Sequence, residues 1–374
     1  MIPVCEPLLT GKEMEFVRDC LETNWISSMG KYIPMFEERF AAFCGASRAV
    51  ACCNGTAALH LALAALGVGR GDEVILPSFT MVATLNAVLY TGATPVLADS
   101  EMDTWNMDID AAREKITSRT RAIIAVHTYG HPVDMDPLME LAARHGIKVV
   151  EDAAEAHGAE YKNRRAGSLG HIAAFSFYSN KIITTGEGGM VVTSDAALAD
   201  RAASLRNHCF GVPRFVHHEM GFNYRMTNIQ AAIGCAQMEQ ADMLVESRIR
   251  VARQYQDKLR DMPGMTLPPQ ACWAKNVYWM FGILLDGDFG CSMPELQEAL
   301  RKRGVETRAF FAPMNRQPFF QEQMRQTGQD PDSFPNADRL GENGLYLPSG
   351  SGLTEKQIET VATALADARR ETKP

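Results

Sequence analysis

The sequence predicts an α/β fold in which a largely parallel sheet is covered by helices on both faces. From about residue 45 to residue 195, short apolar runs alternate with helix-like segments, and after about residue 228 the pattern becomes helix-rich. Alternation of this kind is typical of parallel strands joined by helical crossovers. The runs expected to form strands are EVILPS (73–78), ATPVLAD (93–99), RAIIAVH (121–127), IKVVEDAA (147–154), HIAAFSF (171–177) and GMVVTS (189–194).

Helices are expected between several of these runs. TAALHLALAALG (56–67) and DPLMELAARHG (136–146) are helix-like, and the second ends in the His-Gly pair expected at a helix C-terminus. The helix-rich stretch 229–262 is expected to contain a long helix that joins the two parts of the chain and is closed by Pro263 and Gly264.

The C-terminal part has its own strand and helix signals. VYWMFGILL (277–285) is strand-like, and SMPELQEALRKRG (292–304) is helix-like. Thr354 with Gln357 three residues later resembles a capping box at the start of a last helix. The second part is therefore expected to be α/β as well.

The composition allows two domains and excludes some partners. A chain of 374 residues, 46% of them hydrophobic, can bury a large core. The change of pattern divides it into a large domain (1–240) and a smaller C-terminal domain (241–374). The net charge of −8 argues against binding to nucleic acid or an anionic membrane surface.

The sequence predicts neither a targeting segment nor a disulfide or metal framework. Charges at Glu6, Lys12 and Glu13 leave no room for a signal peptide, and no apolar stretch is long enough to span a membrane, so we expect a cytoplasmic protein. The nine cysteines are scattered without paired CxxC spacing, which predicts reduced thiols and no metal site.

Lys181 is the first candidate for chemistry. It lies in AFSFYSNKIITTGEGGM (174–190), after an apolar run and before a turn rich in threonine and glycine. An apolar setting disfavours an ammonium, so the pKa of the lysine falls and its amine can act as a nucleophile or Schiff-base partner. The alternative is a lysine whose stem packs while its charge reaches solvent or an ion pair.

Two further motifs fit a phosphorylated cofactor. Asp152 follows an apolar run, so it should lie at the carboxyl end of a parallel strand, where ligands bind and where a carboxylate can pair with a protonated pyridine nitrogen. Asn54, Gly55 and Thr56 precede a helix, whose first amides can bind one phosphate. Ordinary helix capping is the alternative at both places.

These motifs, with others along the chain, resemble the DegT/DnrJ/EryC1 family of sugar aminotransferases. The resemblance implies a fold type I pyridoxal phosphate enzyme, aspartate-aminotransferase-like, with a mostly parallel mixed sheet in its large domain. The segments that carry it are NWISSMGKYIPMFE, NGTAALHLAL, GDEVILPSFT, VHTYGHPVDMD, VEDAAEAHGA, GSLGHIAAFSFYSNKIITTGEGGM, GFNYRMTNIQAAIG and LYLPSGSGLT.

The resemblance also implies roles for individual residues. Lys181 would form a Schiff base with the cofactor and then move the proton between its C4′ and the substrate carbon. Asp152 would pair with the pyridinium nitrogen, and Glu155 would hydrogen-bond near the phenolic oxygen. The phosphate would be held by Gly55, Thr56 and Ser176, together with Asn223 from the neighbouring subunit of a homodimer.

Two positions depart from the family pattern. Met81 stands where the family usually has an aromatic residue that stacks on the pyridine ring. A thioether can still lie against a ring, and a core methionine is the alternative. Asn315 stands where relatives often carry histidine, in a segment that bears on substrate recognition.

The expected substrates are a nucleotide-linked keto sugar and L-glutamate. The resemblance implies transfer of the amino group of glutamate to C4 of GDP-4-keto-6-deoxy-D-mannose, with UDP- or dTDP-linked keto sugars as the alternative. A C3 keto-sugar or cyclitol aminotransferase, a sugar dehydratase and a non-catalytic cofactor-binding regulator remain rival readings. Substrate-binding candidates are Lys31, His208, Arg214, Arg225 and Arg308, since a nucleotide diphosphate needs cations.

Overall fold

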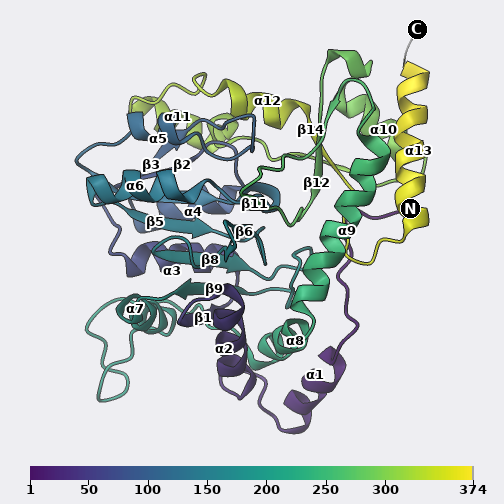
Figure 1. The fold of residues 1–374 in the computed structure, drawn as a ribbon. Helices are drawn as coiled ribbons and strands as arrows, with labels where there is room; N and C mark the ends of the chain where they lie inside the picture. Colours follow the sequence, from purple (N-terminus) through teal and green to yellow (C-terminus); the bar gives the residue numbers. More distant parts are fainter. Residues whose placement is uncertain (373–374) are drawn as a thin grey trace.

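The central feature of the fold is a seven-stranded sheet of order β1-β9-β8-β5-β4-β2-β3, seen here in a computed structural model that describes residues 1–372 (Figure 1). Only β9 runs against its neighbours β8 and β1, so the sheet is mixed but mostly parallel, as predicted. The strands are β1 (Arg48–Cys52), β2 (Glu73–Pro77), β3 (Thr94–Ala98), β4 (Thr120–Val126), β5 (Lys148–Asp152), β8 (Ile172–Ser176) and β9 (Gly189–Thr193).

Helices cover this sheet because they connect successive parallel strands. Helix α3 packs against α4 and α7, while α5 packs against α6 on the other face, and α2 packs against β1 and β9. Strands β2, β8 and β9 are buried along their whole length, as expected between two helical layers. The helices are α1 (Glu13–Glu22), α2 (Tyr32–Cys44), α3 (Gly55–Ala65), α4 (Val82–Thr91), α5 (Ile109–Glu114), α6 (Met135–His145) and α7 (Ala196–Arg206).

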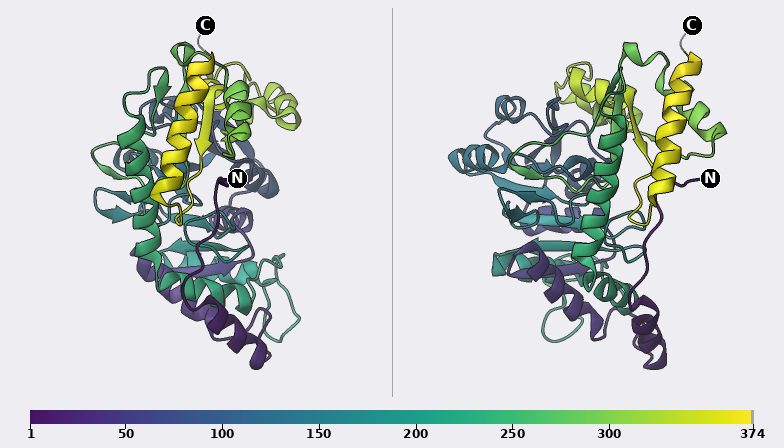
Figure 2. Two further views of the ribbon diagram at one scale, coloured as in Figure 1. Left: turned by 90° about the vertical axis from the view of Figure 1, so that its right-hand side faces the viewer. Right: turned by 45° about the vertical axis from the view of Figure 1, so that its right-hand side comes forward.

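The C-terminal part forms a smaller antiparallel sheet of order β10-β12-β14-β13. Helices α9 and α10 each pack against α13, which runs along the side of the molecule in Figure 2. Helix α8 (Asn228–Met238) still packs against α1 and α2 of the first part. The elements after it are α9 (Ala241–Leu259), β10 (Met265–Thr266), β12 (Phe281–Leu285), α10 (Met293–Lys302), β13 (Arg308–Ala309), α11 (Pro318–Gln326), α12 (Pro335–Asn343), β14 (Gly344–Leu347) and α13 (Glu355–Thr372).

A small third sheet joins the two parts of the chain. It has the order β11-β6-β7, with β6 (Glu160–Tyr161) and β7 (Arg164–Arg165) from the first part and β11 (Ala274–Lys275) from the second. The N-terminus also crosses over, because Ile2 bridges Val305 and the Val4 carbonyl accepts from Ser349 N. The division into domains at residue 240 stays a prediction, and residues 2–4 lie with the second part (Figure 2).

The long helix expected within the stretch 229–262 is α9, and it is preceded by α8 because the chain leaves helical geometry at Gln240. One expectation about a strand was wrong in detail. The strand expected at 277–285 begins only at Phe281, because Tyr278 has φ of +48° and cannot continue a ladder. The capping box predicted at Thr354 is confirmed, since its Oγ and N both contact Gln357 Oε1 at 2.9 Å.

Within residues 1–372, no helix is both long and apolar enough to cross a membrane.

Candidate active site

A cavity of about 700 Å³ opens where the carboxyl ends of the parallel strands meet the C-terminal part of the chain. This is the position at which α/β sheets bind ligands, and the volume is ordinary for a cofactor site. Of the predicted site residues, the cavity brings together Gly55, Thr56, Met81, Asp152, Glu155, Ser176, Lys181 and Arg308.

Lys181 reaches this cavity from the turn that follows β8. Its side chain is only 10% exposed, and its Nζ lies 3.9 Å from Glu155 Oε1 and 3.6 Å from the centroid of the Trp279 ring. Burial lowers the pKa of Lys181, while the charges of Glu155 and Asp152 act in the opposite direction. The lysine therefore lies against the cavity and does not extend into bulk solvent.

Asp152 ends β5 and is held by two donors. Its Oδ2 accepts from Thr84 Oγ1 at 2.7 Å, and its Oδ1 accepts from Ala154 N at 3.2 Å. Burial raises the pKa of this carboxyl group, and these hydrogen bonds partly offset the rise. A buried carboxylate at this place is suited to pair with a cationic group on a ligand.

Glu155 lies between the lysine and the chain that follows β4. Its Oε2 accepts from Tyr129 N at 2.8 Å. Burial raises the pKa of Glu155 to about 7, and the charge of Lys181 opposes that rise. Its protonation is therefore sensitive to any charge that enters the cavity.

The start of α3 forms a close-fitting cradle against β8. Asn54 caps this helix, since its Oδ1 accepts from Ala57 N at 2.8 Å. A Cβ on Gly55 would lie 2.6 Å from Ser176 Cβ, so only glycine allows the helix to start this close to the strand. The first amides of α3, the Thr56 hydroxyl and the Ser176 hydroxyl thus border one side of the cavity.

These residues fit pyridoxal phosphate. The cradle at Gly55 has the donors and the close backbone approach that a phosphate needs, Asp152 offers a buried carboxylate, and Lys181 offers an amine in the same cavity.

Met81 lies at the cavity and not in the core. It is the N-cap residue of α4, it is 46% exposed, and its Sδ lies 3.0 Å from Ala83 N. The alternative of a core methionine is therefore not supported. Its contact with a cofactor ring stays a prediction.

The remaining predicted residues do not line the cavity of this subunit. Lys31 is exposed and pairs with Asp19 at 2.8 Å, and Arg225 Nη1 donates to Asn207 Oδ1 at 2.9 Å. His208, Arg214 and the exposed Asn223 belong to the loop after α7, which projects from the molecule at the lower left of Figure 1.

Two histidines near the site have other contacts. His127 Nε2 lies 3.0 Å from Glu151 Oε2, and its Nδ1 accepts from Val133 N at 3.1 Å. His157 is fully buried and packs against the rings of Phe40, Phe175 and Phe177. Neither lines the cavity.

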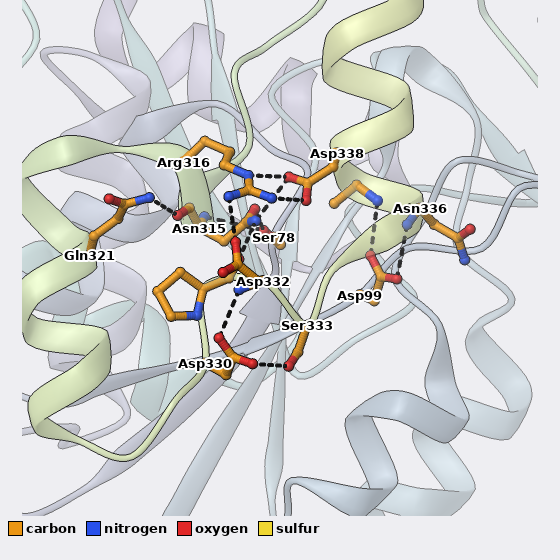
Figure 3. Close-up of polar contacts among 12 residues, drawn as sticks. Ser78, Asp99, Asn315, Arg316, Gln321, Asp330, Asp332, Ser333, Asn336 and Asp338 are labelled. Carbon is orange, nitrogen blue, oxygen red and sulfur yellow. Dashed lines mark hydrogen bonds and ion pairs between the residues drawn. The ribbon is translucent and has the colours of Figure 1, made fainter.

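Asn315 is a tether, as Figure 3 shows. It is fully buried, its Oδ1 accepts from Ser78 Oγ at 2.6 Å, and its Nδ2 donates to Pro331 O at 2.8 Å and Asp338 Oδ1 at 2.9 Å. Arg316 pairs with Asp338 beside it. Asn315 therefore ties the segment before α12 to the end of β2 and does not line the cavity.

Sequence reasoning missed several residues of the cavity wall. Trp279, Phe311 and Tyr346 come from the C-terminal part, and Tyr178 and Glu187 flank Lys181. Only Tyr178 and Glu187 could have been found from the sequence, since they lie in the segment 174–190 that contains Lys181. Among residues 1–372, no group of three or more metal-ligating side chains could hold a metal ion.

The mostly parallel sheet between helices, with a cavity at the carboxyl ends of its strands, is the architecture of the fold type I aminotransferases that depend on pyridoxal phosphate. Solved structures similar to this chain include such enzymes. The structure of the aminotransferase TlmJ from Streptoalloteichus hindustanus superposes with a TM-score of 0.92 at 30% identity, over 99% of both chains.

The comparisons of sequence narrow this class to a family. The sequence model of the DegT/DnrJ/EryC1/StrS aminotransferase family matches residues 7–366, and the chain belongs to this family. It is 45% identical to a GDP-perosamine synthase of Caulobacter vibrioides, over 97% of both chains. It is 43% identical to a GDP-perosamine synthase of Escherichia coli O157:H7, over 96% of this chain and 95% of the relative. The protein is thus a sugar aminotransferase of a pyridoxal-phosphate-dependent family.

Proposed function

We propose that the protein transfers the amino group of L-glutamate to C4 of GDP-4-keto-6-deoxy-D-mannose, forming GDP-perosamine, with pyridoxal phosphate as its cofactor. The observation that carries the reaction type is the placement of Lys181 in one cavity with Asp152 and the start of α3. The GDP-linked sugar is supported by whole-chain similarity to proteins named GDP-perosamine synthase.

The residues of the cavity divide the work of holding the cofactor. The amides at Gly55, with the hydroxyls of Thr56 and Ser176, would bind the phosphate, and Met81 would lie against the ring. Asp152 would accept a hydrogen bond from the ring nitrogen and keep it protonated. Pyridoxal phosphate held in this way supplies an electron sink to the carbon that loses or gains a proton.

Lys181 would serve both halves of the reaction. Its amine would hold the cofactor and, when free, would take a proton from one carbon and return it to another. In the first half glutamate leaves as 2-oxoglutarate, and in the second the keto sugar receives the nitrogen at C4. Since burial lowers the pKa of Lys181, the displaced amine is neutral, and so able to accept a proton, at a lower pH than an exposed lysine would be.

A homodimer would complete the site. Asn223 is exposed and does not line its own cavity, so we propose that Asn223 of the partner subunit reaches the phosphate. The loop that carries it exposes Val212, Phe215 and Met220, and an apolar surface of this kind is suited to a subunit contact. Lys31, His208, Arg214, Arg225 and Arg308 remain the proposed contacts to the nucleotide sugar, of which Arg308 lines the cavity.

The test is a substrate panel. The purified protein would be incubated with pyridoxal phosphate, glutamate and GDP-4-keto-6-deoxy-D-mannose, with the UDP- and dTDP-linked keto sugars in parallel, and the products identified by mass spectrometry. We expect an amino sugar from the GDP compound and none from Lys181→Ala. Product from another nucleotide sugar alone would retain the mechanism and reject the substrate. Turnover by Lys181→Ala would reject the mechanism.

A further inference from the structure

Arg248 on α9 is a buried cation that the proposed mechanism does not use. It is 2% exposed, and within residues 1–372 no carboxylate forms an ion pair with it. A buried charge without an ion pair is costly unless all of its donors are satisfied. Its contacts should therefore be specific.

Every N–H of the Arg248 guanidinium has an acceptor. A guanidinium has five donors in a planar fork, and five acceptors surround this one. They come from the N-terminal segment, the turn before Lys181, the chain before β12 and the loop after β14. The acceptors are Cys5 Sγ at 3.1 Å, Asn180 O at 3.3 Å, Trp279 O at 3.0 Å, Ser351 Oγ at 3.0 Å, and Ser349 O.

Two of these contacts fix the surroundings of Lys181. The Asn180 carbonyl belongs to the peptide bond that joins Asn180 to Lys181, and it also accepts from Trp279 Nε1 at 2.9 Å. Arg248 in turn holds the Trp279 carbonyl, and the Trp279 ring lies 3.6 Å from Lys181 Nζ. The backbone at the base of the lysine and the ring beside its amine are thus held by the same guanidinium.

We infer that Arg248 is a positioning residue for Lys181, which acts by fixing the Asn180 carbonyl and the Trp279 ring so that the lysine amine stays against the cavity. The inference rests on the proposed covalent role of Lys181. It assigns the second part of the chain a direct share in the site, since Arg248 and Trp279 both lie beyond residue 240.

The charge of Arg248 has a further effect on the amine. Among the groups that act on Lys181, the charges of Glu155 and Asp152 favour its protonated form, and that of Arg248 disfavours it. A ring at 3.6 Å also favours the ammonium. Arg248 therefore opposes the groups that would keep the lysine charged, alongside burial.

The test measures the reactivity of Lys181 without turnover. Full-length protein freed of cofactor would be acylated with acetic anhydride over a range of pH, and labelling of Lys181 would be quantified by peptide mass spectrometry. Arg248→Met should raise the apparent pKa of Lys181 by about half a pH unit or more, since a repelling charge is lost. Arg248→Lys keeps the charge but has fewer donors, so the pH profile should stay near wild type while the cofactor dissociates at least threefold faster from the holoenzyme.

Arg165→Met is the control, because Arg165 also donates to a backbone carbonyl but lies away from the cavity, where it pairs with Asp242. It should change neither readout. Circular dichroism would show whether each variant folds. If Arg248→Met does not fold, Trp279→Phe replaces it as the test. This variant keeps an aromatic ring but removes the donor to Asn180 O, so cofactor release should also be faster than in wild type.

The inference is overturned if folded Arg248 variants, or Trp279→Phe, match wild type in both the labelling profile and cofactor release. This outcome can be told apart from failure of the proposed function. If the proposed substrate is wrong, the sugar panel gives product from another nucleotide sugar and the labelling of Lys181 does not change. If Lys181 is not required for catalysis, Lys181→Ala still turns over substrate.

Discussion

Gly55→Ala should damage both the fold and the cofactor site, because the space for a methyl group is absent. The added Cβ would lie 2.6 Å from Ser176 Cβ and 3.2 Å from Ser176 Cα. Carbon atoms pack at about 3.5–4.0 Å, so the overlap is about 1 Å. Ser176 cannot move easily, since its backbone pairs with Gly189 of β9 at the end of β8. The start of α3 must therefore shift, and the amides of the phosphate cradle shift with it.

The magnitude follows from these contacts. Overpacking of this kind costs about 1–3 kcal/mol in the free energy of unfolding. We expect a displaced cradle to weaken cofactor binding about tenfold, or about 1.4 kcal/mol. Equilibrium unfolding in urea would measure the first effect and titration with pyridoxal phosphate the second. Gly69→Ala is the control, because nothing lies within 4 Å of its added Cβ.

A double variant tests whether the clash with Ser176 causes the loss of stability. In Gly55→Ala with Ser176→Gly, the Cβ that the new methyl group meets is absent. The double variant should therefore have a free energy of unfolding about 1 kcal/mol higher than the sum of the two single effects predicts. Wild-type stability and cofactor affinity in Gly55→Ala alone, or strict additivity in the double variant, would refute the steric argument.

Three further results are expected. Asp152→Asn should fold normally but lower kcat about 100-fold or more, because the carboxylate that would pair with the ring nitrogen is lost, and a kcat near wild type would remove Asp152 from that role. Asn315→Ala should lower the free energy of unfolding by about 2–4 kcal/mol because it leaves buried partners unsatisfied, whereas a loss of activity without loss of stability would contradict its assignment as a tether. Burial lowers the pKa of His131 to about 4, and its Nε2 accepts from Ala271 N at 3.1 Å. The folded chain therefore binds this proton less readily than the unfolded chain, so stability is full above about pH 6.5 and falls toward pH 4, by at most about 1.4 kcal/mol per pH unit. His131→Gln should flatten the urea midpoint against pH in this window, and an unchanged slope would show that other groups titrate there.

The sheet was predictable because its signal is local. The buried strands contain short apolar runs, and polar residues at the carboxyl ends of those runs, such as Asp152, mark the edge where ligands bind. Lys181 was found for the same reason, since an ammonium between an apolar strand and a glycine-rich turn is unusual within a short window. The break at Gln240 was not found, because the residues on either side are good helix formers and no proline or glycine marks it.

Contacts between distant segments could not be predicted. Trp279 follows Lys181 by 98 positions, and its strand-like surroundings do not indicate that the strand begins only at Phe281 or that the ring lies beside the Lys181 amine. The sequence around Asn315 suggests a segment that bears on substrate recognition, and only the packing of that segment on Ser78 shows Asn315 to be a tether.

The sequence by itself determined the α/β architecture and the positions of Gly55 at a helix start, Asp152 at a strand end and Lys181 after a strand, because each depends on neighbours within one element. Tertiary structure alone decided which side chains surround the lysine amine. The guanidinium of Arg248 joins four segments far apart in the chain, and the charge, burial and position of Lys181 depend on distances that no local pattern contains.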